Sequence, residues 1–297
     1  MERQQFEIST IILAYNEEIH IERCIRNAQK YAKEIFVVDS FSTDQTREIA
    51  EKLGAKVYQH EFRNYAAQFQ WALDNLPIQT EWVWRQDADE YLSDELVAEI
   101  KERLVDLPDD ISGFTAPCLR IFMGKYIKHG IVPLILLRLF KYKYGSIEQK
   151  MMDEHIQLSQ GRVEDLKNPF YDDNLNGLAW WTNKHNGYSD REALDLLFTE
   201  YGLHDETPST IGTHSASVRK KKLKYVKLPL FWRAFAFFCY RYFIRLGFLD
   251  GKEGFLWHFL QGFWYRLLAD AKVFEIKKRF NWNRDKIVEY LKTFKAD

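Results

Sequence analysis

Several features that define common protein classes are missing from this sequence of 297 residues. It has three cysteines, Cys24, Cys118 and Cys239, and no CxxC or Cys–His spacing joins them. This small, odd number of cysteines fits a reducing compartment better than a disulfide framework or a zinc site. No stretch of about 18 residues is free of charge, so we expect no membrane-spanning helix. The first residues, MERQQFEIST, contain no apolar core, so we expect no signal peptide.

Charge and glycine patterns exclude further classes. The chain carries 42 Lys and Arg against 43 Asp and Glu, a formal net charge of −1, which does not favour nucleic acid as a partner. Neither GxGxxG nor GxxxxGK[ST] occurs, so a dinucleotide fingerprint and a P-loop are both absent. Any bound diphosphate must therefore be bound by a metal cation rather than by a glycine-rich loop.

The first 110 residues alternate between short apolar segments and helical ones. Runs rich in β-branched residues predict strands over 8–14, 34–39, 55–59 and 81–86. Apolar spacing and capping residues predict helices over 16–31, 44–53 (capped by Thr43 and ended by Gly54), 65–75, and onward from Ser93. This alternation indicates an α/β fold with a mostly parallel sheet and right-handed crossovers.

Beyond residue 110 the pattern changes. Short strands and loops are expected over 111–185, including a strand over 134–141, and mostly helix from residue 189 onward. No low-complexity linker marks a boundary, and we place one near residue 215. The predicted organisation is a catalytic domain over 1–215, followed by a helical, aromatic and basic appendage over 216–297.

Polar side chains follow three of the predicted strands at their carboxyl ends, where ligands bind in open parallel sheets. YNEE follows the first strand, Asp39 ends the second, and Asp87 and Asp89 follow the fourth. Two carboxylates at one strand end can hold a hard cation such as Mg²⁺ or Mn²⁺, which also binds substrate phosphates. Other interpretations stay open, because an isolated D-x-D is often a solvated turn. Asp39 either starts a turn or accepts a hydrogen bond from a nucleobase or ribose.

These segments resemble family-2 glycosyltransferases of GT-A fold. The resemblance rests on TIILAYNEEIHIERCI, EIFVVDSFSTDQT and WVWRQDADE, in this order, and covers at least residues 8–100. Three later segments, LLRLFKYKYG, MMDEHI and NKHNGYSDREA, resemble the branch that builds bacterial lipopolysaccharide core and related surface glycans. The resemblance implies a Rossmann-like catalytic domain, inverting transfer from a nucleotide-diphosphate sugar, and Mn²⁺ or Mg²⁺ as cofactor.

The resemblance also implies roles for individual residues. The residues implied to bind the donor are Ala14, Tyr15, Glu17, Asp39, Gln68, Asp87 and Ala88, with the metal held by Asp87 and Asp89. The general base that deprotonates the acceptor hydroxyl would be Glu154. Relatives often read His-Glu where this chain reads Asp153-Glu154, so Asp153 either shares that role or replaces it. Contacts to the diphosphate or acceptor would come from Arg138, Lys184 and His185, although a structural ion pair is equally open for Arg138.

The last third of the chain combines positive charge with aromatic rings. Residues 219–247 include nine Lys or Arg and no Asp or Glu. On a helical projection Arg233, Arg241 and Arg245 share one side, and aromatic and aliphatic residues cover most of the rest. Such a helix is typical of a membrane interface, and packing into a domain core is the alternative. We expect a cytoplasmic protein, peripheral on the inner face of the bacterial inner membrane, with no nucleic-acid partner.

The resemblance further implies transfer of a hexose, such as glucose from UDP-glucose, to a hydroxyl of lipopolysaccharide core or another lipid-linked surface glycan. Two alternatives remain. One is a catalytically inactive adaptor of the same fold that binds glycans or membranes, which the intact Asp87, Asp89 and Glu154 disfavour. The other is a sugar nucleotidyltransferase, which needs a basic glycine-rich loop where this chain has the acidic YNEE.

Overall fold

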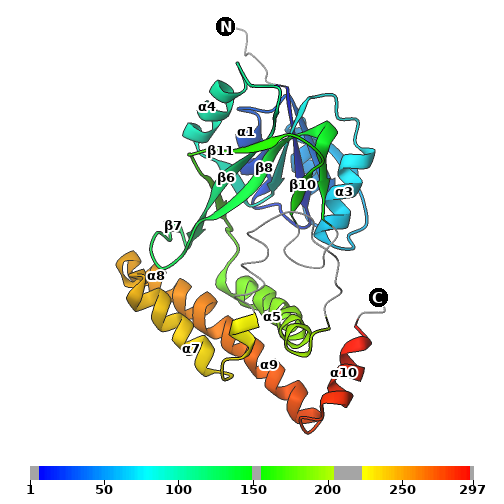
Figure 1. Ribbon diagram of the computed structural model, residues 1–297. Helices are drawn as coiled ribbons and strands as arrows, with labels where there is room; N and C mark the ends of the chain where they lie inside the picture. Colours follow the sequence, from blue (N-terminus) through cyan, green and yellow to red (C-terminus); the bar gives the residue numbers. More distant parts are fainter. Residues whose placement is uncertain (1–6, 149–154, 204–222, 295–297) are drawn as a thin grey trace. The chain divides into compact units, whose positions relative to one another are not determined.

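The computed structural model describes residues 7–148, 155–203 and 223–294 (Figure 1). The chain divides into two compact units. The first comprises Met1–Tyr126 and Pro133–Leu175, and the second comprises Ile127–Val132 and Asn176–Asp297. The boundary predicted near residue 215 lies outside the described residues.

The first unit is built on a ten-stranded mixed sheet with the order β3-β2-β1-β4-β8-β6-β12-β5, in which β7 and β11 also pair with β6. Its strands are β1 Ile8–Ala14, β2 Glu34–Asp39, β3 Lys56–Gln59, β4 Trp82–Asp87, β5 Glu90–Leu92, β6 Ile111–Phe122, β7 Lys125–Tyr126, β8 Leu134–Lys141, β11 Arg162–Asp165 and β12 Phe170–Asp173. Strands β1 to β4 pair in parallel, as predicted, while β8 is antiparallel to β4 and β6. Two further strands, β9 Gly145–Ile147 and β10 Ile156–Leu158, form a separate hairpin sheet.

Helices cover both faces of the parallel part of the sheet (Figure 1). They are α1 Ile21–Ala28, α2 Thr46–Lys52, α3 Tyr65–Asn75 and α4 Asp94–Arg103. Side chains alternate along β1, so that Ile11 packs in a cluster with Phe69 of α3, and Ile12 packs in another with Ile25 of α1. Every residue of β1 is buried for this reason, which explains why its sequence is a continuous apolar run rather than an alternating one.

The starts of two helices differ from the prediction. Helix α1 begins at Ile21 rather than residue 16, because the preceding residues form a turn that is hydrogen-bonded to the loop after β2. Thr43 does not cap α2. The Asp44 carboxylate accepts from the Thr46 backbone N–H at 3.0 Å instead. Gly54 ends this helical segment with φ +84°, and Ser93 caps α4 through the Leu96 N–H at 3.0 Å, both as predicted.

The second unit is helical, as predicted for the C-terminal region. Its elements are α5 Leu178–Tyr201, α7 Trp232–Cys239, the π-helix η2 Tyr240–Ile244, the 3₁₀ helix η3 Gly247–Asp250, α8 Gly251–Trp257, the π-helix η4 His258–Trp264, α9 Tyr265–Arg279 and α10 Arg284–Lys292. Apolar side chains of α5, α9 and α10 form its core. The segment Ile127–Val132 is bound to this unit through the Asp250 carboxylate, which accepts the backbone N–H groups of Lys128 and His129 at 3.0 and 2.8 Å.

Of the three arginines predicted to share one side of a helix, two are buried. Arg233 forms an ion pair of 2.5 Å with the fully buried Asp270, and Arg241 donates to the Gly130 carbonyl at 3.0 Å and to Gln261. Arg245 alone of the three is exposed. The helix turns its arginines inward because their hydrogen-bond partners lie there. In residues 7–148, 155–203 and 223–294, none of the helices has the length and hydropathy of a transmembrane span.

Candidate active site

The carboxyl ends of three neighbouring strands come together at one edge of the sheet. Ala14 at the end of β1 is in register with Asp39 of β2, and Leu13 is in register with Asp87 of β4. The sequence predicted this convergence, since parallel strands end at the same edge. Tyr15, the next residue after β1, is 59% exposed and open to a ligand.

The loops after β1 and β2 are cross-linked by short polar contacts. Asn16 donates its backbone N–H to the Ser42 hydroxyl at 2.9 Å and accepts from the Thr43 N–H at 2.8 Å. Glu17 donates its backbone N–H to the Thr46 hydroxyl at 2.7 Å. Asn16 adopts φ 54°, a left-handed conformation that Asn tolerates better than most residues. The two loops therefore form one connected backbone surface beside the strand ends.

Asp39 and Gln68 are both buried and are engaged by neighbouring loops. The Asp39 carboxylate accepts from the Ser42 N–H at 3.1 Å and from the Gln59 amide at 3.2 Å, which is the turn-starting arrangement. Gln68 donates to the Ser40 hydroxyl at 3.1 Å and pairs with His60 Nδ1 at 2.7 Å. These contacts fix the loop after β2. A nucleotide-binding role for either residue remains a prediction.

Asp89 is held by residues far along the chain. Its carboxylate accepts from the Asn174 side-chain amide at 2.9 Å, and its backbone carbonyl accepts from the Asp173 N–H at 3.1 Å. Arg23 of α1 donates to the same carbonyl at 3.3 Å and forms an ion pair of 2.5 Å with Asp173. Nothing in the sequence indicated that residues 173 and 174 reach this turn.

Asp87 is positioned by a buried ion pair. Its backbone N–H donates to Glu90 Oε2 at 3.0 Å, and Glu90 Oε1 lies 2.5 Å from Arg138 Nη2. The same guanidinium nitrogen lies 3.7 Å from Asp87 Oδ2. Burial raises the pKa of Glu90. Burial also disfavours the Arg138 cation, but the charges of Glu90 and Asp87 outweigh this and raise its pKa. Of the two interpretations of Arg138, the structure shows the ion pair.

His20 orients another carboxylate beside the strand ends. The Leu175 backbone N–H donates to His20 Nε2 at 2.8 Å, so Nε2 is the acceptor nitrogen and Nδ1 carries the proton. Nδ1 therefore donates to the Glu17 carboxylate at 2.5 Å. The His20 side chain is fully buried and the Glu17 side chain is 19% exposed. Glu17 thus has a fixed orientation in the loop after β1.

Comparison with known proteins identifies the family of the domain that carries these residues. Residues 9–148, which include β1 to β8 and the strand-end residues, match the model of glycosyl transferase family 2. The chain contains a family-2 glycosyltransferase domain. The predicted family and transferase class are thereby confirmed.

Relatives of this glycosyltransferase match over different lengths. An uncharacterized glycosyltransferase of Rickettsia typhi is 28% identical over 98% of this chain and 95% of its own length. The lipopolysaccharide core biosynthesis glycosyltransferase LpsC of Rhizobium meliloti is 32% identical over 112 residues, 36% of this chain and 40% of that protein. The mannosyltransferase PcManGT of Pyrobaculum calidifontis, solved with GDP-Man and Mn²⁺, is 17% identical with a TM-score of 0.50, covering 91% of this chain and 87% of its own. This structural likeness confirms the predicted fold class.

The donor set of the glycosyltransferase domain suits a hard divalent cation. Asp87 and Asp89 present carboxylate oxygens on either side of the buried Ala88, and the Asp87 side chain is 36% exposed. Within the described ranges, no three His, Cys, Asp or Glu side chains gather into a complete metal cluster. Mg²⁺ commonly binds one or two carboxylates and takes its remaining ligands from water and substrate phosphates, which fits this pair.

Four of the predicted site residues belong to other parts of the chain. Asp153 and Glu154 lie outside the described residues. Lys184 and His185 are on α5 of the second unit, where Lys184 Nζ lies 4.5 Å from the Trp180 ring centroid. His185 stacks on Trp181 with ring centroids 3.5 Å apart, and its Nδ1 lies 2.9 Å from the Trp181 carbonyl. Roles for these residues in binding diphosphate or acceptor remain predictions.

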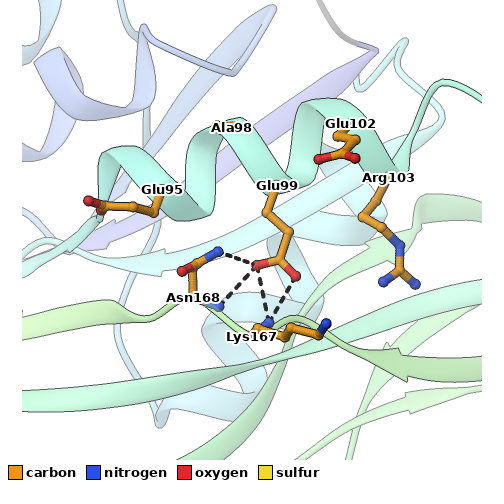
Figure 2. Close-up of a pocket in the computed structure, with 7 residues that line it drawn as sticks. All are labelled: Glu95, Ala98, Glu99, Glu102, Arg103, Lys167 and Asn168. Atoms are coloured by element: carbon orange, nitrogen blue, oxygen red, sulfur yellow. Dashed lines mark hydrogen bonds between the residues drawn. The ribbon is translucent and has the colours of Figure 1, made fainter.

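A surface hollow on the first unit lies between α4 and the segment before β12, which hydrogen bonds join. Figure 2 shows that Glu99 of α4 accepts from the backbone N–H groups of Lys167 and Asn168 and from the Asn168 amide, at 2.9–3.1 Å. These bonds tie the segment before β12 to α4. The hollow is lined by none of the predicted site residues.

Proposed function

We propose that this protein transfers a hexose, such as glucose, from a nucleotide-diphosphate donor, such as UDP, to a hydroxyl of a lipopolysaccharide-core or related surface-glycan acceptor. The observation that carries the proposal is the meeting of Ala14, Asp39 and Asp87 at one sheet edge within a family-2 glycosyltransferase domain. The match to LpsC supports the class of acceptor. The acceptor is lipid-linked, and the enzyme works at the cytoplasmic face of the inner membrane.

The donor nucleotide binds across the ends of β1 and β2. The exposed ring of Tyr15 and the backbone of Ala14 border it, and Glu17, oriented by His20, lies beside them. The Asp39 carboxylate accepts from the base, in addition to the bonds that it already receives from the Ser42 and Gln59 nitrogens. A carboxylate has about four lone-pair sites, so the bonds within the loop leave capacity for a nucleobase.

The leaving diphosphate binds at the carboxyl end of β4. Asp87 and Asp89 would hold Mn²⁺ or Mg²⁺, which would offset the negative charge that develops on the leaving diphosphate. The solved complex of PcManGT contains Mn²⁺ together with its donor, which supports this cofactor. Glu90 and Arg138 keep Asp87 in place, and Asn174 keeps Asp89 in place.

The acceptor hydroxyl is activated by Glu154, or by Asp153. The carboxylate takes the proton while the hydroxyl oxygen attacks the anomeric carbon in line with the departing diphosphate. This single displacement inverts the configuration at that carbon. Lys184 and His185 contact the diphosphate or the acceptor.

The deciding experiment measures thermal stability against UDP, GDP, dTDP and CMP, each with and without Mn²⁺. A ligand present at about 100 times its Kd adds roughly 2.7 kcal/mol to the stability. We expect a metal-dependent rise in Tm for one nucleotide. Asp89→Ala abolishes this rise, whereas the exposed Asp94→Ala, on α4, retains it. If no nucleotide changes the Tm in the presence of metal, the proposed donor site is wrong.

A further inference from the structure

The second unit exposes an unusual concentration of large apolar side chains. Between residues 231 and 259, all of them described, the exposed side chains include no Asp or Glu. We define the aromatic face as the exposed large apolar residues from the start of α7 to residue 259: Trp232, Phe235, Tyr240, Phe243, Ile244, Leu246, Phe248, Leu249, Phe255 and Phe259. Trp232 and Ile244 are each 71% exposed. Soluble monomers rarely expose contiguous apolar patches of such extent, and those that exist mark interaction sites.

Ring contacts make the aromatic face continuous. The succession runs from one end to the other through neighbouring centroids 5.7–6.3 Å apart: Trp232, Phe235, Phe263, Phe259, Phe255, Tyr242 and Phe248. Phe243 joins it through Tyr242 at 5.1 Å. The face therefore spans α7, η2, η3, α8 and η4 as one surface.

Buried polar contacts hold the aromatic face outward. Arg233 is paired with Asp270, and Arg241 is bonded to Gly130 and Gln261. Asp250 accepts from His129 Nδ1 at 2.7 Å on the inner side of the same helices. Rotating these helices to bury the rings would leave two guanidinium groups and a carboxylate without their partners, which is strongly destabilising. The exposure of the rings is thus a property of the folded unit.

We propose that the aromatic face inserts into the interfacial layer of an anionic lipid bilayer. The exposed charges within the stretch, Arg245 and Lys252, are both positive. Lys224 and Lys227 are exposed just before it. Cations that flank aromatic rings match an anionic headgroup layer, and Trp and Tyr favour that depth. This deepens the proposed function, because an enzyme acting on a lipid-linked acceptor needs such a surface.

The charges favour a bilayer over a second copy of the chain as the occupant. A symmetric dimer places the same patch against itself. Two aromatic faces in contact would bring Arg245 and Lys252 of both copies together, while the two carboxylates of the stretch, Asp250 and Glu253, are buried and half-buried. An anionic lipid layer covers the rings and neutralises the cations at once.

The test is binding of the full chain to phosphatidylcholine vesicles with and without phosphatidylglycerol, measured by co-sedimentation. Trp232→Ser/Ile244→Ser lowers the partition coefficient at least about tenfold, because two large side chains no longer insert. The matched control Val105→Ser/Met123→Ser, at positions 64% and 60% exposed in the first unit, binds as the wild type does. Arg245→Gln/Lys252→Gln weakens binding to the anionic vesicles on the order of tenfold, an effect removed by high salt.

Two results overturn the proposal. One is equal vesicle binding by the wild type and Trp232→Ser/Ile244→Ser. The other is a wild-type oligomer, seen by light scattering without lipid, that this variant dissociates, which would assign the face to a second copy. The nucleotide-dependent rise in Tm reports separately on the donor site. If vesicle binding behaves as expected while no nucleotide raises the Tm, the lipid surface stands and the proposed transfer reaction fails.

Discussion

The Glu90–Arg138 pair allows a test in which two substitutions change metal binding in opposite directions. The Arg138 guanidinium is 2.5 Å from Glu90 and 3.7 Å from Asp87, and both Arg138 and Glu90 are almost fully buried. Glu90 therefore draws the arginine away from the carboxylate that is proposed to bind metal. The energies involved are large, because opposite charges 3.7 Å apart interact by about 4 kcal/mol at an effective dielectric constant near 20.

Glu90→Gln removes the charge that competes with Asp87 for Arg138. The guanidinium then pairs more fully with Asp87, and Mn²⁺ must displace it in order to bind. If about a third of the Coulomb energy opposes the metal, its Kd rises on the order of tenfold. Arg138→Met does the reverse, because it leaves the carboxylates of Glu90 and Asp87 without their cation. Loss of one partner of a buried ion pair costs about 3–5 kcal/mol, and bound Mn²⁺ supplies the missing charge.

The assay is thermal unfolding with and without Mn²⁺ and nucleotide, combined with calorimetric titration of the metal. We expect Glu90→Gln to show a smaller Mn²⁺-dependent rise in Tm than the wild type. Arg138→Met should show a lower Tm without metal and a larger rise with it. Asp270→Asn is the matched control, because it breaks the buried pair with Arg233 in the second unit and should destabilise without changing Mn²⁺ affinity. A change in metal affinity of the same sign in both site variants would refute the reasoning.

Further predictions concern the other contacts of the two units. Asn174→Ala removes the amide that donates to the Asp89 carboxylate at 2.9 Å. The Mn²⁺ concentration needed for half-maximal transfer should therefore rise several-fold. An unchanged metal requirement would show that the contact is dispensable. Burial, reinforced by the positive charge of Arg241, lowers the pKa of His258 to about 4. The unfolded chain, in which a His pKa is about 6.5, therefore binds a proton that the folded chain excludes. The free energy of unfolding consequently falls as the pH falls from about 6.5 to about 4. Urea unfolding should show about 2 kcal/mol lost between about pH 7 and 5, and the loss should be smaller in His258→Gln. Gly130→Ala should lower the free energy of unfolding by about 3 kcal/mol, because φ is +70° and the new Cβ would lie 2.5 Å from the His258 ring. Gly177→Ala is the control and should be nearly neutral in the same urea measurement, because its new Cβ would meet open space.

The local sequence pattern was sufficient to predict the helices and strands that carry the site residues. The predicted bounds of 65–75 and 134–141 coincide with α3 and β8, and the three strand ends meet as expected. Apolar runs and capping residues encode such elements within a few positions of the chain, which explains why they can be read without a structure. The start of α1 could not be read in this way, because the loop after β2 captures the residues before it.

The partners of the site residues were decided by tertiary structure. Glu90 and Arg138 are 48 positions apart, Asp89 and Asn174 are 85, and His20 and Leu175 are 155. No periodicity links positions so distant. In the sequence DADE, Glu90 directly follows the metal pair. Only the pairing of β8 with β4 gives Glu90 its partner Arg138.

The C-terminal helices show the same division between what the sequence and the fold determine. The sequence by itself determined that arginines and aromatic rings occupy different sides of a helix, because side-chain position along a helix follows from spacing alone. Which side faces inward depended on Asp270, Gly130 and Gln261, which come from other elements and satisfy the arginines. The tertiary structure therefore decided that Arg233 and Arg241 face inward and that the rings are exposed, because a buried guanidinium needs its partners more than a ring needs burial.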